Sequence, residues 1–262
     1  MFRLLTYNIQ RGGHGRLDAI AEVIDSCAPD LVLLQEATDR SNVERLAAAT
    51  GMADWRTSGT QSLGFLSRRP VAHCEWVRPR ISRHAFVEVV PDGEGVRVFG
   101  VHLSAVHAAW TEQRRVLELR ALLRSIERHQ HGFHVLAGDF NTVAPGEAFD
   151  IGRLPMRIRP LVWLSGGRIN WRTIEVVLNA GYVDAFRLHH PGEPGATLPA
   201  SNPYVRLDYV FAPQPHAGRL LDCRVVRGLA AETASDHLPV VADLAIDGPD
   251  VHEHSASRGV PR

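Results

Sequence analysis

The sequence is short of the features that mark several protein classes. The three cysteines, Cys27, Cys74 and Cys223, are odd in number and widely spaced, so we predict buried, reduced thiols rather than a disulfide framework. No apolar run reaches the roughly 18 residues that a bilayer-crossing helix needs. The chain opens on an apolar segment, MFRLLTYNI, with no basic region or cleavage site before it, so we expect a cytoplasmic protein without a transmembrane segment.

Net charge is also lacking. Lys and Arg number 29, Asp and Glu number 29, and no lysine-rich arm is present. This balance argues against a dedicated nucleic-acid binder, which usually has a basic excess, although it leaves room for a local basic groove. The 262 residues can bury a sizeable core, and we place one catalytic domain in residues 1–247. Residues 248–262 are polar and contain proline, which predicts a disordered tail.

Three catalytic or ligand-binding signatures are missing. The glycine-rich loop around Gly12, Gly13 and Gly15 has no GxxxxGK pattern, so it is not a typical phosphate loop. No GxSxG segment supports a serine nucleophile. No thiolate cluster or HExxH helix is present, which argues against a closed structural zinc site.

The hydrophobic pattern predicts many short strands with helices between groups of them. Helical spacing covers residues 17–27 before Pro29, a second helix capped by Ser41 covers 42–49, and further helices are expected over 111–127 and 171–179. The residues 91–95, PDGEG, are typical of a hairpin turn. Strands are expected over residues 2–9, 31–34, 62–67, 73–77, 84–90, 96–104, 134–139, 182–186, 205–211, 223–226 and 235–244. This order fits two packed sheets flanked by helices.

Polar groups stand where six of these apolar strands end. Any one of them has an ordinary structural explanation, such as a turn cap, an ion pair or a satisfied core histidine. Together they are four carboxylates, two imidazoles and two amides: Asn8, Glu36, His102, Asp139, Asn141, Asp208, Asp236 and His237. If the strands approach from one direction, these groups converge on one pocket.

Such a set suits one reaction class. Clustered carboxylates repel one another unless a cation offsets them, and hard oxygen ligands favour Mg²⁺, with Mn²⁺ as an alternative. Amides and imidazoles can hold the oxygens of an anionic substrate, while a histidine and a carboxylate supply acid and base. We therefore predict metal-assisted attack of water on a phosphate ester.

The segments TYNI, LQE, VHLS, GDFN, RLDYVF and SDHLPV, in this order from residue 6 to residue 240, resemble the endonuclease/exonuclease/phosphatase superfamily. That superfamily includes deoxyribonucleases, abasic-site endonucleases, neutral sphingomyelinases and inositol polyphosphate phosphatases. The resemblance implies an α/β protein, a four-layer α/β/β/α sandwich of two mixed β-sheets flanked by helices. It also implies a metal-dependent phosphoric ester hydrolase.

The resemblance also implies a role for each residue. Glu36 would be the principal metal ligand, with Asn8 beside it and Asp236 as a second metal-side carboxylate. Asp139 would activate the attacking water. The scissile phosphate would be held by Asn141, His102 and His237, and His102 would also stabilise the transition state or protonate the leaving oxygen. Asp208 would pair with His237 and fix its tautomer.

The substrate stays open at this point. Nucleic acid, a phospholipid head group and a small phosphate such as an inositol phosphate all fit, and a silent phosphate-binding module is an alternative from another class. His102 stands where abasic-site endonucleases carry a tyrosine, which argues against an abasic-site specialist. Residues 155–172 mix apolar residues with arginines and are either a packed subdomain segment or an exposed feature near the site. Nothing in the sequence identifies a protein partner.

Overall fold

Two six-stranded sheets organise the chain, with strand orders β11-β12-β1-β2-β4-β3 and β5-β6-β7-β8-β10-β9. The structure is a computed structural model that describes residues 1–58, 62–79, 85–105, 109–126, 132–147, 151–153, 156 and 172–246. We call the first sheet A and the second sheet B.

Sheet A consists of β1 (Phe2–Asn8), β2 (Leu31–Gln35), β3 (Asp54–Thr57), β4 (Leu63–Ser67), β11 (Leu220–Val225) and β12 (Val240–Leu244). Sheet B consists of β5 (Val71–Val77), β6 (Phe86–Pro91), β7 (Arg97–His102), β8 (His134–Asp139), β9 (Tyr182–Asp184) and β10 (Asp208–Pro213). Both sheets are mixed, because β1 runs parallel to β2 and β7 runs parallel to β8, while the other described pairs are antiparallel.

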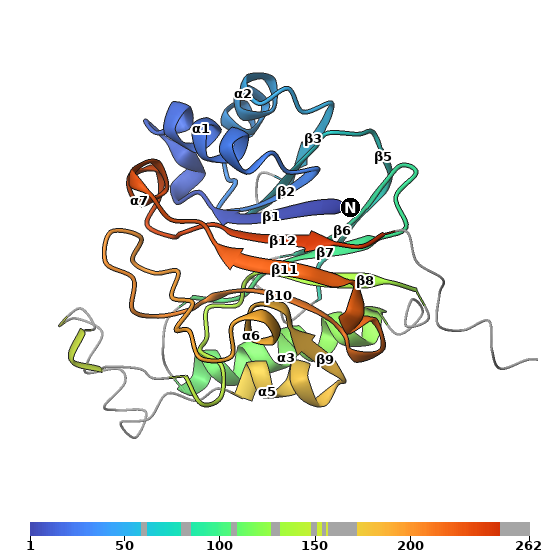
Figure 1. The fold of residues 1–262 in the computed structure, drawn as a ribbon, viewed down its shortest axis with the longest axis vertical. Helices are drawn as coiled ribbons and strands as arrows, with labels where there is room; N and C mark the ends of the chain where they lie inside the picture. The colour runs from blue at the N-terminus through green and yellow to red at the C-terminus, as the bar shows by residue number, and fades with distance from the viewer. Residues whose placement is uncertain are drawn as a thin grey trace, which may run out of the picture.

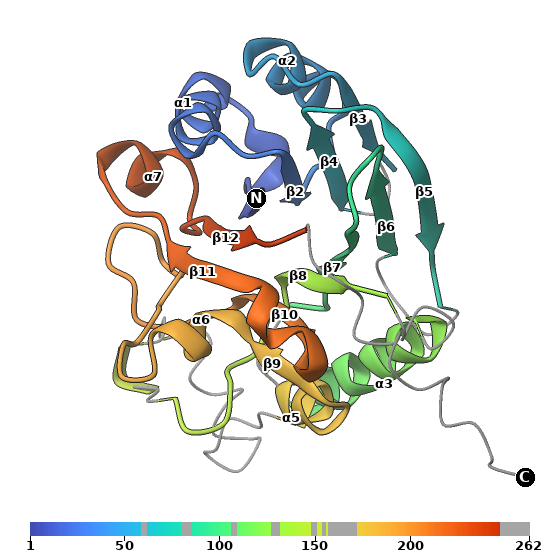
Figure 2. The ribbon, with the colours of Figure 1, turned by 45° about the vertical axis from the view of Figure 1, so that its right-hand side comes forward.

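Helices cover the outer faces of the two sheets (Figures 1 and 2). On sheet A lie α1 (Leu17–Cys27), α2 (Arg40–Ala49) and α7 (Leu229–Ala234); on sheet B lie α3 (Ala109–Ile126) and α5 (Arg172–Asn179). The short α6 (Ala185–His189) packs on β10 and β11, and the 3-10 turns are η1 (Arg11–Gly13), η3 (Ile151–Arg153) and η4 (Gln214–Arg219). The predicted four-layer sandwich is confirmed.

The alternation of side chains along each strand explains this layering. Along β6, Val87 and Val89 lie in the central cluster between the sheets, whereas Phe86 packs toward the helices on sheet B. Along β1, Leu4 lies in the central cluster and Leu5 packs toward the helices on sheet A. The central strands of each sheet are therefore buried on both faces, which is why they are apolar on successive residues, whereas the edge strands β3 and β5 are partly exposed.

Most predicted elements are confirmed, and the differences have local causes. The second helix begins at Arg40 and is capped by the Asp39 carboxylate, which accepts hydrogen bonds from the backbone of Ser41 and Asn42, so the prediction of Ser41 as the cap is wrong. The strand predicted over 182–186 ends at Asp184, whose side chain caps α6.

Two further predicted strands are too long at their starts. The regular strands begin at Asp208 rather than at residue 205, and at Val240 rather than at residue 235. The residue before Val240 is Pro239. Proline has no N–H for a hydrogen bond to a neighbouring strand, so the regular pairing of β12 begins only after it.

The remaining predictions about organisation have mixed outcomes. All three cysteines are free thiols, and Cys27 and Cys223 are buried while Cys74 is half-buried. Among the described residues, no helix combines the length and the apolar character needed to cross a membrane. The tail 248–262 lies outside the described residues, and so does most of the segment 155–172.

Candidate active site

Three predicted site residues stand side by side on sheet B. His102 pairs in register with Asp139 across the parallel β7–β8 pair, and Asp208 pairs with Asp139 across the antiparallel β8–β10 pair. Gly138, just before Asp139, has a φ of 146°, and a Cβ placed there would lie 1.9 Å from the carbonyl oxygen of Val101. Glycine is required at this position because the backbones of β7 and β8 approach so closely.

Sheet A delivers Asn8 and Glu36. Asn8 is the last residue of β1, and Glu36 directly follows β2, which pairs in parallel with β1. The side chain of Asn8 donates to Asp139 Oδ2 at 3.1 Å, so it joins the two sheets across the interior. Glu36, just after β2, and Asn141, just after β8, adopt left-handed backbone conformations, with φ of 56° and 52°.

Asp139 is the centre of this set. Its side chain is 1% exposed and accepts hydrogen bonds from the backbone N–H of Asn141 at 2.8 Å and from the Asn8 amide. Burial, followed by the nearby charge of Asp208, raises the pKa of Asp139 to about 7, and His237 and the hydrogen bonds only partly oppose this rise. A carboxylate with such a pKa is a stronger base than an ordinary aspartate.

His237 and Asp208 form a buried imidazole–carboxylate pair. The Nδ1 atom of His237 lies 2.9 Å from Asp208 Oδ2. Burial lowers the pKa of His237, but the charge of Asp208 and its hydrogen bond outweigh burial and raise the pKa to about 10. His237 therefore carries a positive charge at neutral pH and can attract an anionic oxygen.

The two histidines face the same carboxylate oxygen. The Nε2 atoms of His102 and His237 lie 3.9 Å and 4.0 Å from Asp139 Oδ2. These separations are longer than direct hydrogen bonds, which are about 2.7–3.2 Å, so an oxygen atom between the three groups could contact all of them. The ring of His102 is oriented by Ser62, whose Oγ lies 2.9 Å from Nδ1. The arrangement can hold a water molecule or a phosphate oxygen beside a base.

The loop that follows β1 connects Asp236 and Glu36 to the other site residues by hydrogen bonds. Gln10 connects Asn8 to Asp236, because its backbone N–H donates to Asn8 Oδ1 at 3.0 Å and its side-chain amide donates to Asp236 Oδ2 at 2.9 Å. The backbone N–H of Arg11 donates to Glu36 Oε2 at 2.6 Å. Glu36 and Asp236 are half-buried and the other six predicted residues are buried.

Comparison with known proteins agrees with this arrangement. The sequence pattern of the Endonuclease/Exonuclease/phosphatase family matches residues 5–237. The chain belongs to this family. Its members are phosphoester hydrolases, so the predictions of the superfamily and of a hydrolase are confirmed.

Solved structures show the same fold at low sequence identity. An abasic-site (AP) endonuclease from Archaeoglobus fulgidus has a TM-score of 0.70 and 20% identity, covering 93% of this chain and 99% of its own. The 3'-5' exonuclease NExo from Neisseria meningitidis has a TM-score of 0.72 and 24% identity, covering 93% and 99%. A 3' phosphatase NExo variant from Neisseria, bound to a product DNA hairpin, has a TM-score of 0.71 and 23% identity, covering 94% and 100%. Among curated proteins, none shows significant similarity to the chain.

The donor set of this family member fits a hard divalent cation. Four carboxylates surround the site, and Asp208 Oδ1 is buried with no hydrogen-bond partner among the described residues. Glu36, Asn8 and Asp236 offer oxygen atoms, which suit Mg²⁺ or Mn²⁺. Burial is the larger cause of the raised pKa of Asp139, and the charge of Asp208, which adds to it, is what a cation would offset.

Asp139, Asp208 and His237 form a further group of possible ligands, and their ligand atoms lie within 4.8 Å of one another. In this grouping Asp208 Oδ2 lies 2.9 Å from His237 Nδ1, whereas Asp208 Oδ1 has no hydrogen-bond partner among the described residues.

Sequence reasoning missed three residues that support the site. Gln10 links Asn8 to Asp236, and Ser62 orients His102. Arg16 donates to the backbone carbonyls of Ile9 and Gln10, and also to that of Ala234, so it ties the loop after β1 to the segment that carries Asp236 and His237. Gln10 lies two residues after Asn8, and that proximity was the one available signal; Ser62 and Arg16 had none.

Proposed function

We propose that this protein is a divalent-cation-dependent phosphodiesterase in which Asp139 activates the attacking water. The observation that carries the proposal is the buried Asp139 carboxylate, with a pKa raised to about 7, facing the Nε2 atoms of two histidines at 3.9 Å and 4.0 Å. A base, a cationic hydrogen-bond donor and a second imidazole around one small space can together assist hydrolysis of a phosphate ester.

Each residue has a role in the proposed reaction. Asp139 accepts a proton from the water, and the Asn141 backbone and the Asn8 amide hold its carboxylate in place. The protonated imidazole of His237, oriented by Asp208, donates through Nε2 to a phosphate oxygen and stabilises the charge that develops there. His102 Nε2, which lies 3.9 Å from Asp139 Oδ2, donates to the phosphate or to the leaving oxygen.

Glu36, Asn8 and Asp236 would hold the cation. When bound, Mg²⁺ or Mn²⁺ supplies electrostatic stabilisation of the charge on the phosphate. The loop residues Gln10 and Arg11 position these ligands by the hydrogen bonds that they donate to Asn8, Asp236 and Glu36.

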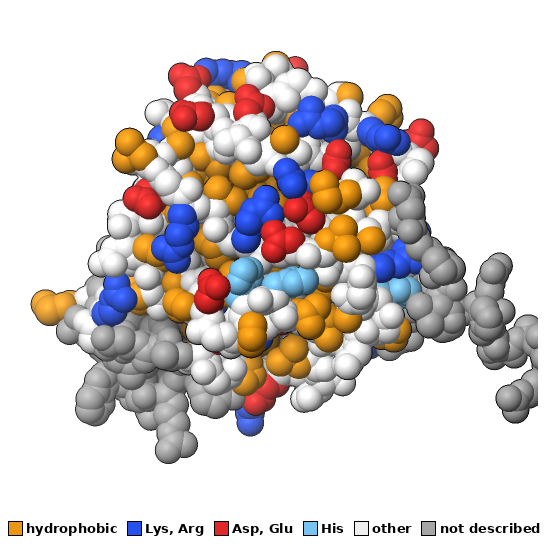
Figure 3. All heavy atoms as spheres, in the orientation of Figure 1, with side chains coloured by type: hydrophobic (Ala, Val, Ile, Leu, Met, Phe, Trp, Pro, Cys, Tyr) orange, Lys and Arg blue, Asp and Glu red, His pale blue; other side chains and the backbone are white. Residues whose placement is uncertain are grey.

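Nucleic acid is the substrate class that we propose. Its support is the fold shared with an AP endonuclease and with a 3' phosphatase bound to a DNA hairpin. On the face shown in Figure 3, Arg side chains are interspersed with Asp and Glu side chains rather than forming one basic patch. We therefore expect weak binding to duplex DNA, with recognition centred on the phosphate at the site.

The first experiment measures hydrolysis of bis-p-nitrophenyl phosphate with Mg²⁺ and with Mn²⁺. We expect activity in the wild type, loss of activity in EDTA and recovery when the metal is restored. Asp139→Asn keeps the shape of the side chain but removes the base, so kcat should fall by about 10²–10⁴-fold. If Asp139→Asn is as active as the wild type, the assignment of the base is wrong. Activity that survives chelation contradicts the role given to Glu36.

Asp208→Asn tests the imidazole pair separately. Without the carboxylate, His237 loses the group that raises its pKa, so it no longer carries a stable positive charge at neutral pH. We expect kcat/KM to fall by at least about 100-fold, since a charge-assisted hydrogen bond is worth about 1.5–3 kcal/mol and an aligned imidazole is lost as well. Circular dichroism checks that the variant is folded.

A parallel screen identifies the substrate. Plasmid DNA, a 3'-phosphorylated DNA hairpin, RNA, sphingomyelin vesicles and inositol phosphates are compared at equal metal concentration, with Asp139→Asn as the blank for each. Cleavage of DNA or RNA above that blank supports the proposed substrate. Cleavage of sphingomyelin or of an inositol phosphate alone would replace it while leaving the proposed reaction intact.

A further inference from the structure

A buried carboxylate on α3 lies beside the segments that follow β7 and β8. Glu112, in the first turn of α3, is 3% exposed and is not among the residues that act in the proposed reaction. Its Oε1 atom accepts hydrogen bonds from the backbone N–H and the hydroxyl of Thr173, near the start of α5. Its Oε2 atom accepts hydrogen bonds from Arg115 and from the hydroxyl of Thr142. A buried charge is costly unless it is paired and hydrogen-bonded, so these contacts fix the position of Glu112.

Thr142 connects Glu112 to Asn141, the residue that directly precedes it. The Thr142 hydroxyl donates to Glu112 Oε2 at 3.2 Å, and the Thr142 carbonyl oxygen accepts from the hydroxyl of Tyr209 at 3.0 Å. Asn141 has a φ of 52°, a sparsely populated conformation that persists only where surrounding contacts enforce it. The contacts of the next residue therefore help to hold Asn141 in place.

Arg115 connects the same carboxylate to the segment after His102. Its Nε and Nη2 atoms donate to Glu112 Oε2 at 3.1 Å and 2.8 Å, and its Nη1 atom donates to the backbone carbonyl of Ser104 at 2.8 Å. Ser104 lies two residues after His102, the last residue of β7. The Arg115 side chain is 2% exposed, so its charge depends on Glu112 for compensation.

The segments after β7 and β8 are also joined to each other. The side-chain amide of Asn141 donates to the Leu103 carbonyl at 3.0 Å, and the Leu103 N–H donates to the Asp139 carbonyl at 2.9 Å. Ser104 has a further link to α3, because its backbone N–H and its hydroxyl donate to the buried carboxylate of Glu118. A shift of α3 would therefore reach both segments.

We propose that Glu112 and Arg115 are positioning residues that act through Asn141 and His102. The proposal rests on the proposed function, in which these two side chains hold the scissile phosphate. A misplacement of about 1 Å can cost about 10²-fold in rate, so contacts that fix the two segments contribute to kcat without touching the substrate.

The test is a double-mutant cycle on kcat for bis-p-nitrophenyl phosphate with Mg²⁺, at a temperature at which every variant is folded. Glu112→Gln keeps the size of the side chain and removes its charge. Asn141→Gly removes the amide and tolerates the left-handed backbone. We expect Glu112→Gln to lower kcat at least about tenfold in the wild type, and by a factor at least about threefold smaller in Asn141→Gly.

Arg115→Lys tests the second connection. Lysine keeps the positive charge but lacks the planar fork that joins Glu112 to Ser104. We expect kcat to fall at least about fivefold while KM changes by less than about twofold, and we expect a loss at least about threefold smaller in a His102→Ala background.

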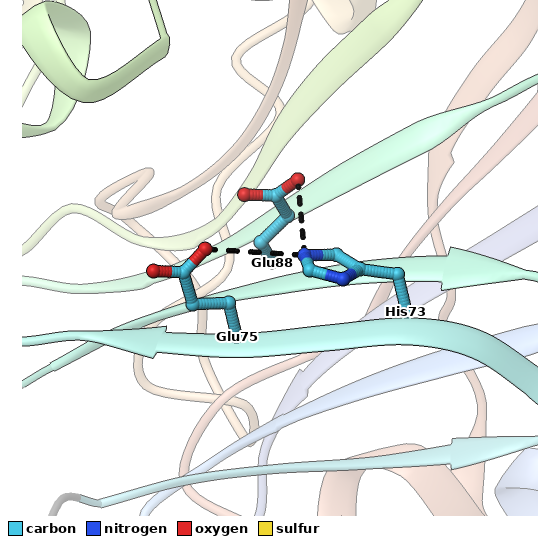
Figure 4. A group of neighbouring side chains, drawn as sticks. All are labelled: His73, Glu75 and Glu88. Atoms are coloured by element: carbon cyan, nitrogen blue, oxygen red, sulfur yellow. Dashed lines mark ion pairs between the residues drawn. The ribbon is translucent and has the colours of Figure 1, made fainter.

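Glu88→Gln is the matched control. Figure 4 shows Glu88 of β6 beside His73 and Glu75 of β5, away from the ends of β7 and β8 that carry the site. Like Glu112, Glu88 is 3% exposed and accepts a hydrogen bond from an arginine, Arg97. Glu88→Gln should lower the free energy of unfolding and leave kcat within about twofold of the wild type.

Two results overturn the proposal. One is an unchanged kcat in Glu112→Gln. The other is a loss of kcat in Glu112→Gln that shrinks by less than about threefold in Asn141→Gly, because a carboxylate that only stabilises the fold acts equally in both backgrounds.

A spectroscopic readout separates this proposal from the proposed function. The NMR signals of the Asn141 side-chain amide and of the His102 imidazole should shift in Glu112→Gln and stay in place in Glu88→Gln. An inactive wild type in which they still shift refutes the proposed function and leaves the positioning of these side chains standing. Signals that stay in place in Glu112→Gln refute the positioning, whatever the activity.

Discussion

Replacing Gly138 with alanine tests whether the close approach of β7 and β8 builds the site. A Cβ on residue 138 would lie 1.9 Å from the carbonyl oxygen of Val101 and 2.7 Å from its carbonyl carbon. Both atoms belong to backbone, so no side chain can rotate away. The two strands would have to separate by more than an ångström at the pair directly before His102 and Asp139.

The expected cost has two parts. Alanine at a φ of 146° is strained, which costs about 1–3 kcal/mol, and overpacking a well-packed interior adds about 1–3 kcal/mol. Gly228 offers a matched control, because its φ is 124° and nothing lies within 4 Å of a Cβ placed there. Gly228→Ala should therefore carry the strain alone, and Gly138→Ala should lose about 1–3 kcal/mol more free energy of unfolding than Gly228→Ala.

Urea unfolding of both variants measures this difference, and phosphodiesterase assays on the folded variants measure its consequence. We expect kcat to fall at least about tenfold in Gly138→Ala, since a misplacement of about 1 Å can cost 10²-fold, and to be retained in Gly228→Ala. If the two variants lose the same free energy of unfolding within about 0.5 kcal/mol, the backbone contact does not limit residue 138 and the reasoning fails.

Two ion pairs outside the site give further predictions. Hydrogen bonds from Arg3 hold the pKa of the Asp243 carboxyl below its usual value. The pair therefore contributes its full stability at any pH above the pKa that Asp243 has in the unfolded chain. That stability is lost as the pH falls through the lower pKa that Asp243 has in the folded protein. Asp243→Asn should lose about 1–2 kcal/mol at pH 7 and less at pH 3, measured as urea midpoints across that range. Glu112→Gln removes the charge that accepts hydrogen bonds from Nε and Nη2 of the buried Arg115, and it should cost about 3–5 kcal/mol, measured by the same method at pH 7; a loss below about 1 kcal/mol would contradict the importance of that pair.

The local pattern of apolar and polar residues was sufficient to predict most of the strands and helices. An apolar run that ends on a polar residue is visible within a few positions, which is why β8 and the residues at its end could be predicted. The short helices α6 and α7 could not, because they have five and six residues and are too short for helical periodicity to show. β9 ends at Asp184 because the Asp184 side chain caps α6, accepting a hydrogen bond from the backbone N–H of Arg187.

The composition of the site was predictable for the same reason, but its supporting contacts were not. Ser62 and His102 are separated by 40 positions, and Gln10 and Asp236 by 226. Serine and glutamine are common on protein surfaces, so neither residue type marks a role. Only the pairing of strands brings them to the groups that they orient.

Distances support the proposal that Asp139, rather than Asp208, is the base. Asp139 and Asp208 are opposite each other in register and equally buried, so burial cannot separate them. His237 separates them, because its Nδ1 lies 2.9 Å from Asp208 while its Nε2 lies 4.0 Å from Asp139. Asp208 is engaged in holding the imidazole, whereas Asp139 keeps a gap wide enough for an oxygen atom. Burial first, and then the charge of Asp208, raises the pKa of Asp139, so the carboxylate that holds His237 also contributes to the basicity that we propose for its neighbour.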